Sequence, residues 1–358
     1  MPHWARSKPR ASDSDPVSLV DGYLGLEMSQ TGHKVLVLGS QGVLGTVLAR
    51  TFADEGWEVL RAGRRPEPGV HLVDLDRPET LRDSLEGVDL VANPVPDERL
   101  VAEEVVLERG PALVNMSAVP AARGWALKRE TASGTGLVLI HAGLVPGVTS
   151  LLAADLLRRH PEADELELAF TLSASGTSGK GGAGLIHRYL TAARHHGTFR
   201  AELGPPLGPR TCLEIGPEER GWLSDDLLSG RAVRLGVYFR ERALQGLFLT
   251  LNALRMIAGT PRLTFVAGRG RVPPEASREP IADWVAVRRG GERLAARVVH
   301  GRGDYRMTAA STVVFGEGLL KLRGAESRRT GVFAPEELFT LEQLRPALER
   351  RGFEIIDR

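Results

Sequence analysis

Three evenly spaced glycines form the clearest chemical signal in the sequence. Gly39, Gly42 and Gly45 follow the apolar run 34–38 and precede apolar residues at helical spacing. A strand that turns through glycines into a helix lets backbone N–H groups approach a pyrophosphate, and the helix dipole stabilises the anion. The spacing Gly-x-x-Gly-x-x-Gly differs from the usual NAD-binding pattern, and a purely structural turn is the alternative. The context favours a dinucleotide, held by Gly39, Ser40, Gln41, Gly42, Val43, Leu44 and Gly45.

Two adjacent arginines, Arg64 and Arg65, follow the next predicted strand, 58–62. Domains that bind NAD usually place an acidic residue here, against the ribose 2′-hydroxyl. Guanidinium groups instead bind a 2′-phosphate through charge-assisted hydrogen bonds, so the pair favours NADP(H), with two solvated surface arginines as the alternative. Asp74 and Leu75 end the third strand and are expected beside the adenine, although Asp74 could equally cap a helix.

Further strand ends are expected at the same edge of a parallel sheet, where ligands bind. Asn93 and Pro94 end the fourth strand and Ser117 follows the fifth, so all three are expected to contact the cofactor. His141 ends the sixth strand and is expected to point toward the nicotinamide. Its imidazole titrates near neutral pH and is therefore a candidate proton donor, with a structural hydrogen bond as the alternative.

A second glycine-rich segment, 173–184, lies between a predicted strand and a predicted helix. It does not match a P-loop, because Lys180 is followed by glycine rather than serine or threonine. The segment predicts a site for a substrate carboxylate, with Lys180 joining His141 as a catalytic residue, and a surface loop is the alternative. The expected substrate-binding residues are Gly143, Pro146, Gly179, Lys180, His187 and Arg188.

Two kinds of chemistry find no support in the sequence. Tyr189, Tyr238 and Tyr305 are followed four residues later by alanine, arginine and alanine, so the Tyr-x-x-x-Lys motif of short-chain dehydrogenases is absent. The histidine pair 195–196 has no cysteine or carboxylate at ligand spacing, so no metal is expected.

Composition narrows the class of protein. The 358 residues include 46 basic and 45 acidic side chains, which gives no reason to expect a nucleic acid or a membrane as partner. The single cysteine, Cys212, excludes a disulfide framework. No apolar run approaches the roughly 20 residues of a membrane span, and the N-terminus lacks the apolar core of a signal peptide. We expect a cytoplasmic homodimer that binds a small-molecule substrate.

Alternating strands and helices predict an α/β fold with a Rossmann-type parallel sheet and right-handed crossovers. Later strand patterns and long helices indicate a second, α+β unit. The predicted organisation is a loosely ordered tail at 1–32, a dinucleotide-binding domain at 33–155, an α+β domain for substrate and dimerisation at 156–325, and a segment at 326–358 that packs back on the first domain. The predicted strands of the second unit include 165–175, 211–215, 232–239 and 262–267, together with a hairpin formed by 284–288 and 294–300. The predicted later helices span 185–195, 244–257 and 307–319, with a further helix within 334–353.

Taken together, these residues resemble the saccharopine dehydrogenase-like (saccharopine reductase-like) oxidoreductases. The likeness extends over most of 34–353. It rests on four segments, which are 39–45, the turn 142–147, 305–308 and 331–339. It implies a Rossmann domain, an inserted α+β domain and a C-terminal segment that folds back. It also implies hydride transfer at a carbon bonded to nitrogen in an amino-acid-like substrate. At this turn, members that act on saccharopine resemble Gly-Leu-Asp-Pro-Gly, and this sequence has Val145 in place of the aspartate. We therefore expect a substrate other than saccharopine, in specialised metabolism.

The leading hypothesis is an NADP(H)-dependent oxidoreductase that acts on an imine or secondary amine of an amino-acid-derived substrate. Such a reduction needs mainly orientation and a proton, because the cofactor carries the hydride. Two alternatives stay open at this point. One is an enoyl or carbonyl reductase on the same scaffold, and the other is a regulator that binds NADP(H) without turnover.

Overall fold

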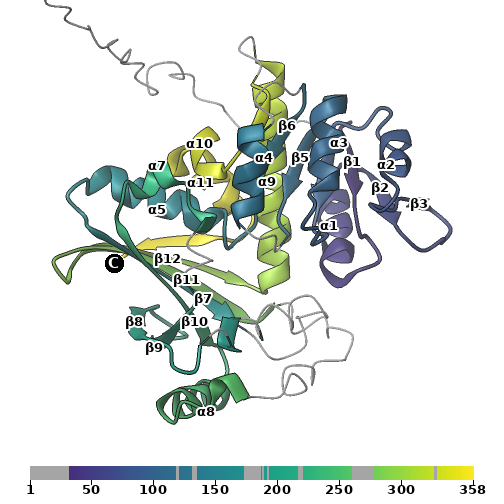
Figure 1. Cartoon of the computed structure of the whole chain (residues 1–358). Coiled ribbons are helices and arrows are strands. Elements are labelled where there is room, and N and C mark those ends of the chain that lie inside the picture. Colours follow the sequence, from purple (N-terminus) through teal and green to yellow (C-terminus); the bar gives the residue numbers. More distant parts are fainter. Residues whose placement is uncertain are drawn as a thin grey trace, which may run out of the picture.

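The computed structural model describes residues 32–117, 121–130, 135–172, 187, 189–191, 193–216, 221–259, 278–325 and 329–358. Two seven-stranded sheets organise these residues, the first on the right and the second on the left of Figure 1. The predicted tail, except for Gly32, lies outside the described residues, as does the predicted strand 262–267.

The first sheet is entirely parallel and has the strand order β3-β2-β1-β4-β5-β6-β13. Its strands are β1 (Lys34–Val37), β2 (Glu58–Gly63), β3 (Val70–Leu72), β4 (Leu90–Asn93), β5 (Ala112–Asn115), β6 (Leu137–Leu139) and β13 (Gly331–Phe333). The order reverses between β1 and β4, and such a reversal opens a crevice at the carboxyl ends of the strands. The prediction of a Rossmann-type sheet is confirmed.

Alternate residues of the central strands pack into two separate cores. Val35 and Val37 of β1 face the core that includes helices α1 (Val43–Asp54) and α9 (Asp304–Gly324). Leu36 faces the opposite core with α3 (Val101–Arg109). The helices α2 (Pro78–Asp83) and α4 (Ala121–Glu130) complete the surroundings of this sheet, and α4 was not expected from the sequence. Because both faces are covered, β4, β5 and β6 are buried throughout, as in other parallel sheets.

The second sheet is mixed and has the order β14-β12-β11-β7-β10-β9-β8. Its strands are β7 (Glu165–Leu172), β8 (Thr198–Glu202), β9 (Pro209–Glu214), β10 (Ala232–Phe239), β11 (Pro280–Arg289), β12 (Glu292–Arg302) and β14 (Glu354–Asp357). The expected hairpin joins β11 to β12, and Gly290 and Gly291 adopt φ values of 56° and 85° in its turn. Positive φ at both central residues is typical of the tight turns that suit twisted hairpins.

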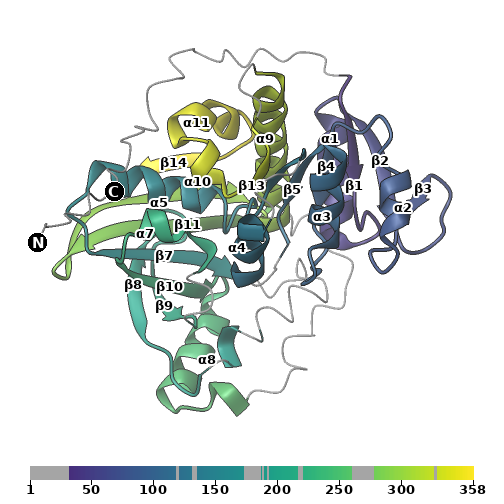
Figure 2. The ribbon, with the colours of Figure 1, turned by 45° about the horizontal axis from the view of Figure 1, so that its top comes forward.

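Helices cover the second sheet and the junction of the two sheets. Helix α5 (Val148–Arg159) lies over β11 and β12, as Figures 1 and 2 both show. The remaining elements are α7 (Asp225–Leu228), α8 (Arg242–Ala253), a 3-10 turn η2 (Ile257–Gly259), α10 (Pro335–Leu338) and α11 (Leu341–Arg350). The helix expected within 334–353 is therefore two helices, α10 and α11, with Phe339 and Thr340 between them in extended conformation.

The elements cross the predicted boundaries between units. Helix α5 follows the first sheet in sequence but packs on the second, whereas α9 follows β12 but packs against α1 and β5 of the first. The C-terminal segment contributes β13 to the first sheet and β14 to the second. Helix α9 packs against the first sheet because it is apolar around much of its circumference and must be covered on several sides.

Candidate functional site

A cleft of about 1730 Å³ runs from the carboxyl edge of the first sheet to the second sheet. The first sheet contributes the glycine turn 38–45 except Ser40, the strand ends 63–65, 73–76, 94–99 and 116–117, and the turn formed by His141 and 143–146. The second sheet and its neighbours contribute Phe170, Thr171, Leu172, Ile281, Asp283, His187, Tyr189, Thr191 and Trp222, and α9 adds Asp304, Tyr305 and Thr308.

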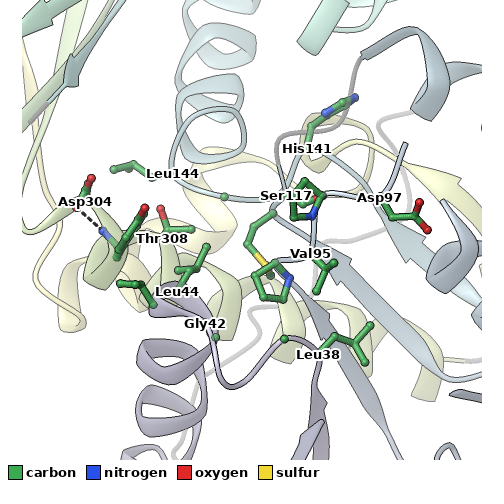
Figure 3. Close-up of a pocket in the computed structure, with 18 of the residues that line it drawn as sticks. Leu38, Gly42, Leu44, Val95, Asp97, Ser117, His141, Leu144, Asp304 and Thr308 are labelled. Atoms are coloured by element: carbon green, nitrogen blue, oxygen red, sulfur yellow. Dashed lines mark hydrogen bonds between the residues drawn. The ribbon is translucent and has the colours of Figure 1, made fainter. Parts of the chain in front are cut away.

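Backbone geometry explains the glycines of the turn. Gly39 has a φ of 57°, in the left-handed region that favours glycine, and a Cβ there would lie 2.8 Å from the Val95 side chain. A Cβ at Gly45 would lie 2.1 Å from the Gly39 carbonyl oxygen, so only glycine fits. Gly42 precedes α1 and has no side chain to cap the N–H groups of the first helical turn. Figure 3 shows Gly42 at the start of this helix, among the residues that line the cleft.

Ser40 and Asn93, two residues predicted to contact the cofactor, have side chains buried behind the cleft lining. The Ser40 hydroxyl is fully buried and donates to the Ala62 carbonyl oxygen at 3.0 Å. The Asn93 amide is also buried and donates to Glu103 at 2.8 Å. Their side chains therefore face the interior, and neither residue lines the cleft.

Gln41 joins the glycine turn to the arginine turn. Its amide nitrogen donates to the Arg65 carbonyl oxygen at 3.0 Å and to the Glu67 carboxylate at 2.9 Å. That hydrogen bond, together with Arg61, lowers the pKa of Glu67. Arg64 and Arg65 are exposed at the edge of the cleft, and neither forms an ion pair with another described residue. Both guanidinium groups therefore remain available to an anion in the cleft.

Three of the four acidic residues that line this end of the cleft form ion pairs, and Glu98 forms none with another described residue. Asp74, which lines the cleft beside Leu75, accepts from Arg77 at 3.4 Å. Arg99 pairs with Asp76 at 2.9 Å and with Asp97 at 3.0 Å. Arg64 and Arg65 are thus the lining cations of this end that have no ion pair with another described residue.

Glu103 holds two cleft turns through two asparagines. Its Oε1 accepts from Asn93 at 2.8 Å and from Asn115 at 2.7 Å, whereas its Oε2 has no partner in the described ranges. The asparagine oxygens accept in turn from the backbone N–H groups of Val95, at 3.0 Å, and Ser117, at 2.7 Å. Burial raises the pKa of Glu103. Sequence reasoning missed this residue, since one acid in a helix looks like a surface residue.

His141 does not have the geometry expected of a proton donor. It has a φ of 56°, and its ring lies 5.7 Å from that of Trp125 on α4. Figure 3 shows this ring directed away from Gly42. The side chain is 5% exposed, and burial lowers its pKa to about 4, so the ring is neutral at pH 7. The ring lines the cleft beside α4, and its expected orientation toward the nicotinamide stays a prediction, whereas a neutral ring at pH 7 does not suit a proton donor.

Asp283 is a cleft residue that the sequence did not indicate. It lies on β11, is 2% exposed and accepts from the Thr171 N–H at 3.0 Å. Burial, with a smaller effect of the Asp304 charge, raises its pKa to about 7. Asp304 begins α9, and Figure 3 shows it on the same side of the cleft as Thr308 and Leu144. The segment 305–308, which carries part of the family resemblance, thus lines the cleft at Tyr305 and Thr308.

Three aromatic residues line the cleft near the second sheet. The rings of Phe170, Tyr189 and Trp222 lie 6.1 to 6.2 Å apart, each against the other two. All three are largely buried, so they present a preformed apolar wall. We call them the aromatic wall.

The remaining predicted residues divide into two groups. Pro94, Ser117, Gly143, Pro146 and His187 all line the cleft. Gly179, Lys180 and Arg188 lie outside the described residues, and the carboxylate site at 173–184 stays a prediction.

Neither a metal-ligand cluster nor a membrane-spanning helix is found in the described part of the chain. No group of three or more His, Cys, Asp or Glu residues there has the arrangement of a metal site. None of its helices combines the length and the apolar character that a membrane span requires.

No protein-family profile matches the sequence, and no curated protein does either. Among solved structures, C. glutamicum DAP dehydrogenase in complex with DAP is similar at 13% identity, over 89% of this chain and 96% of that one, with a TM-score of 0.48. The WlbA (WbpB) dehydrogenase from Thermus thermophilus, in complex with NAD and UDP-GlcNAcA, is 15% identical over 89% and 93% of the chains, with a TM-score of 0.38.

Proposed function

We propose that the chain is an NADP(H)-dependent oxidoreductase that transfers a hydride to or from an imine or secondary-amine carbon of an amino-acid-derived substrate. One observation carries this proposal. A single cleft joins the glycine turn and the arginine pair to the polar and aromatic residues of the second sheet. The cleft lies where the strand order of the first sheet reverses, which is the usual position of a nucleotide in such folds.

The glycine turn and the arginine pair fit a dinucleotide that carries a 2′-phosphate. The turn leaves no room for a side chain at Gly45, and the first turn of α1 offers N–H groups to a pyrophosphate. Arg64 and Arg65 would hold the 2′-phosphate, because Gln41 fixes the turn that carries them. When bound, the nicotinamide supplies or accepts the hydride.

The protein would contribute orientation and exclusion of water. Glu103 fixes the turns at Val95 and Ser117 through its two asparagine partners, and the aromatic wall lines the side of the cleft near the second sheet. His141 would not deliver a proton at neutral pH, because its pKa is about 4. We assign it instead to the wall of the cleft, where it packs on Trp125.

The resemblance to saccharopine reductase-like enzymes supports the carbon–nitrogen chemistry, and Val145 favours a substrate other than saccharopine. The test has two stages. Calorimetry with NADPH and NADH should show tighter binding of NADPH. Incubation with pairs of amines and carbonyl compounds plus NADPH, analysed by mass, should then give a secondary amine and consume the cofactor.

Each stage can contradict the proposal separately. If neither dinucleotide binds, the assignment of the glycine turn is wrong. If NADPH is consumed by an enone or ketone without any amine, the protein is an enoyl or carbonyl reductase. Binding without turnover of any pair would favour a regulator that senses NADP(H).

A further inference from the structure

The cleft changes chemical character along its length. The first-sheet end presents the arginines Arg64 and Arg65, which have no ion pair with another described residue, beside acidic residues that are mostly paired. At the opposite end, the described lining residues of the second sheet and of α9 include two carboxyl groups, Asp283 and Asp304. They also include the three rings of the aromatic wall. The second-sheet end therefore offers carboxyl groups and aromatic rings to a ligand, which suits a cation.

One carboxylate oxygen of Asp283 accepts a hydrogen bond from a described residue, and the other does not. Its Oδ1 accepts from the Thr171 N–H at 3.0 Å, and no described residue hydrogen-bonds to Oδ2. Nearby polar groups already have partners, because the Thr171 hydroxyl donates to the Ala282 carbonyl oxygen at 2.9 Å and lies 2.6 Å from the Tyr238 hydroxyl. No described cation forms an ion pair with Asp283. The residue is 2% exposed, and an ionised carboxylate in so buried a position is unfavourable without a cation beside it.

The pKa of Asp283, raised to about 7, agrees with a buried carboxyl group that has no cation beside it. Burial is the main cause, and the neighbouring Asp304 charge adds to it. A cation placed against this carboxyl group would favour the ionised form and lower its pKa.

The aromatic wall supplies the second half of the site. Phe170, Tyr189 and Trp222 share the cleft with Asp283 and hold one another in place through mutual ring contacts. Aromatic faces attract a cation and bury an apolar substituent at the same time. A carboxylate and three rings that line the same cleft therefore favour a cationic nitrogen that carries an apolar group.

We propose that Asp283 and the aromatic wall form a subsite for the positively charged nitrogen of the substrate, with its apolar substituent packed on Trp222. This inference rests on the proposed function and narrows its substrate class to cationic amines and iminium ions with an apolar or aromatic group.

The test uses small probes and does not require turnover. Benzylamine, benzyl alcohol and benzoate have similar size and differ in charge, and each is titrated into the full chain by calorimetry, with and without NADP⁺. Benzylamine should bind most tightly and benzoate least. Asp283→Asn keeps an oxygen to accept from the Thr171 N–H but removes the charge, and it should weaken benzylamine about tenfold or more.

Two further variants make the result specific. Glu336→Gln changes another fully buried carboxyl group whose pKa is about 7, on α10 outside the cleft lining, and should leave benzylamine binding unchanged. Trp222→Ala should weaken the binding of benzylamine. Trp222→Phe should largely retain it, because phenylalanine keeps an aromatic ring at this position and alanine does not. Thermal unfolding of every variant checks that the fold is intact.

The inference is overturned if benzoate binds as tightly as benzylamine, or if none of the probes binds. It is also overturned if Asp283→Asn, while folded, retains the affinity of the unmodified protein. Failure of the unmodified protein to bind NADPH would instead contradict the proposed function. The titrations without NADP⁺ judge the amine subsite independently of that outcome.

Discussion

Asn93 and Asn115, at the ends of two neighbouring strands, donate to the same oxygen of Glu103, at 2.8 and 2.7 Å. Each asparagine then accepts from a backbone N–H of the turn that follows its strand. A residue on α3 that does not itself line the cleft thus determines the position of two turns that do.

Glu103→Ala should destabilise the protein and weaken NADPH. The change leaves two buried amide groups without an acceptor, which costs about 1–3 kcal/mol for each group. Glu103→Gln retains an acceptor oxygen and should keep more of both properties. Thermal unfolding and calorimetric NADPH affinity measure the two effects. Glu104→Ala, on the exposed side of the same helix, is the matched control, and equal losses in both alanine variants would contradict the role of Glu103.

Replacing Arg64 and Arg65 together with serine should reduce the affinity for NADPH far more than that for NADH. Each charged hydrogen bond lost to a 2′-phosphate is worth about 1.5–3 kcal/mol. Arg82→Ser is the control, because that arginine pairs with Glu108 and does not line the cleft. Equal loss of both cofactors would show that the arginine pair does not bind the 2′-phosphate.

Two glycine substitutions in the same turn should fail in different ways. At Gly42 a Cβ would lie 3.2 Å from the Gly39 carbonyl oxygen, a close but tolerable contact, so Gly42→Asp should fold. Its carboxylate would repel a pyrophosphate and abolish cofactor binding. At Gly45 the corresponding distance is 2.1 Å, so Gly45→Ala should lower the thermal unfolding temperature itself. Unchanged NADPH affinity in folded Gly42→Asp would contradict the assignment of this turn.

Stability should fall in acid because of His141. Its pKa is about 4 in the folded protein and near 6.5 in the unfolded chain, so the unfolded chain binds the proton more tightly. The stabilisation by the neutral ring is present above pH 6.5 and is lost as the pH falls toward 4, by roughly 3 kcal/mol in all. Urea unfolding across this range should show a flatter profile for His141→Gln. His71→Gln, at an exposed histidine, should follow the unmodified protein.

Local sequence patterns were sufficient for the features that depend on neighbouring residues. The apolar runs, the glycine turn and the hairpin glycines each act within a few residues, and all three appear where expected. The Asp283 subsite depends on β7 and β11 lying side by side, which no local pattern encodes. Glu103 likewise acquires its role only through two strand ends that the sheet brings together.

His141 shows a different limit of sequence reasoning. Its position after a strand was correct, but a single positive φ redirects the ring toward α4. Helix α4 was itself unexpected, so its Trp125 was not a foreseeable neighbour. Side-chain direction at a strand end therefore needs coordinates, even where the strand is correctly predicted.

The exchange of α5 and α9 between the sheets has a consequence for how the chain is made and folds. During synthesis the six strands β1 to β6 emerge before α9 and β13, which cover one face and complete the edge of their sheet. A fragment ending near residue 155 should therefore aggregate, because its apolar face is uncovered. The full chain should lose both sheets in one cooperative transition, with neither half able to act as an independent folding unit.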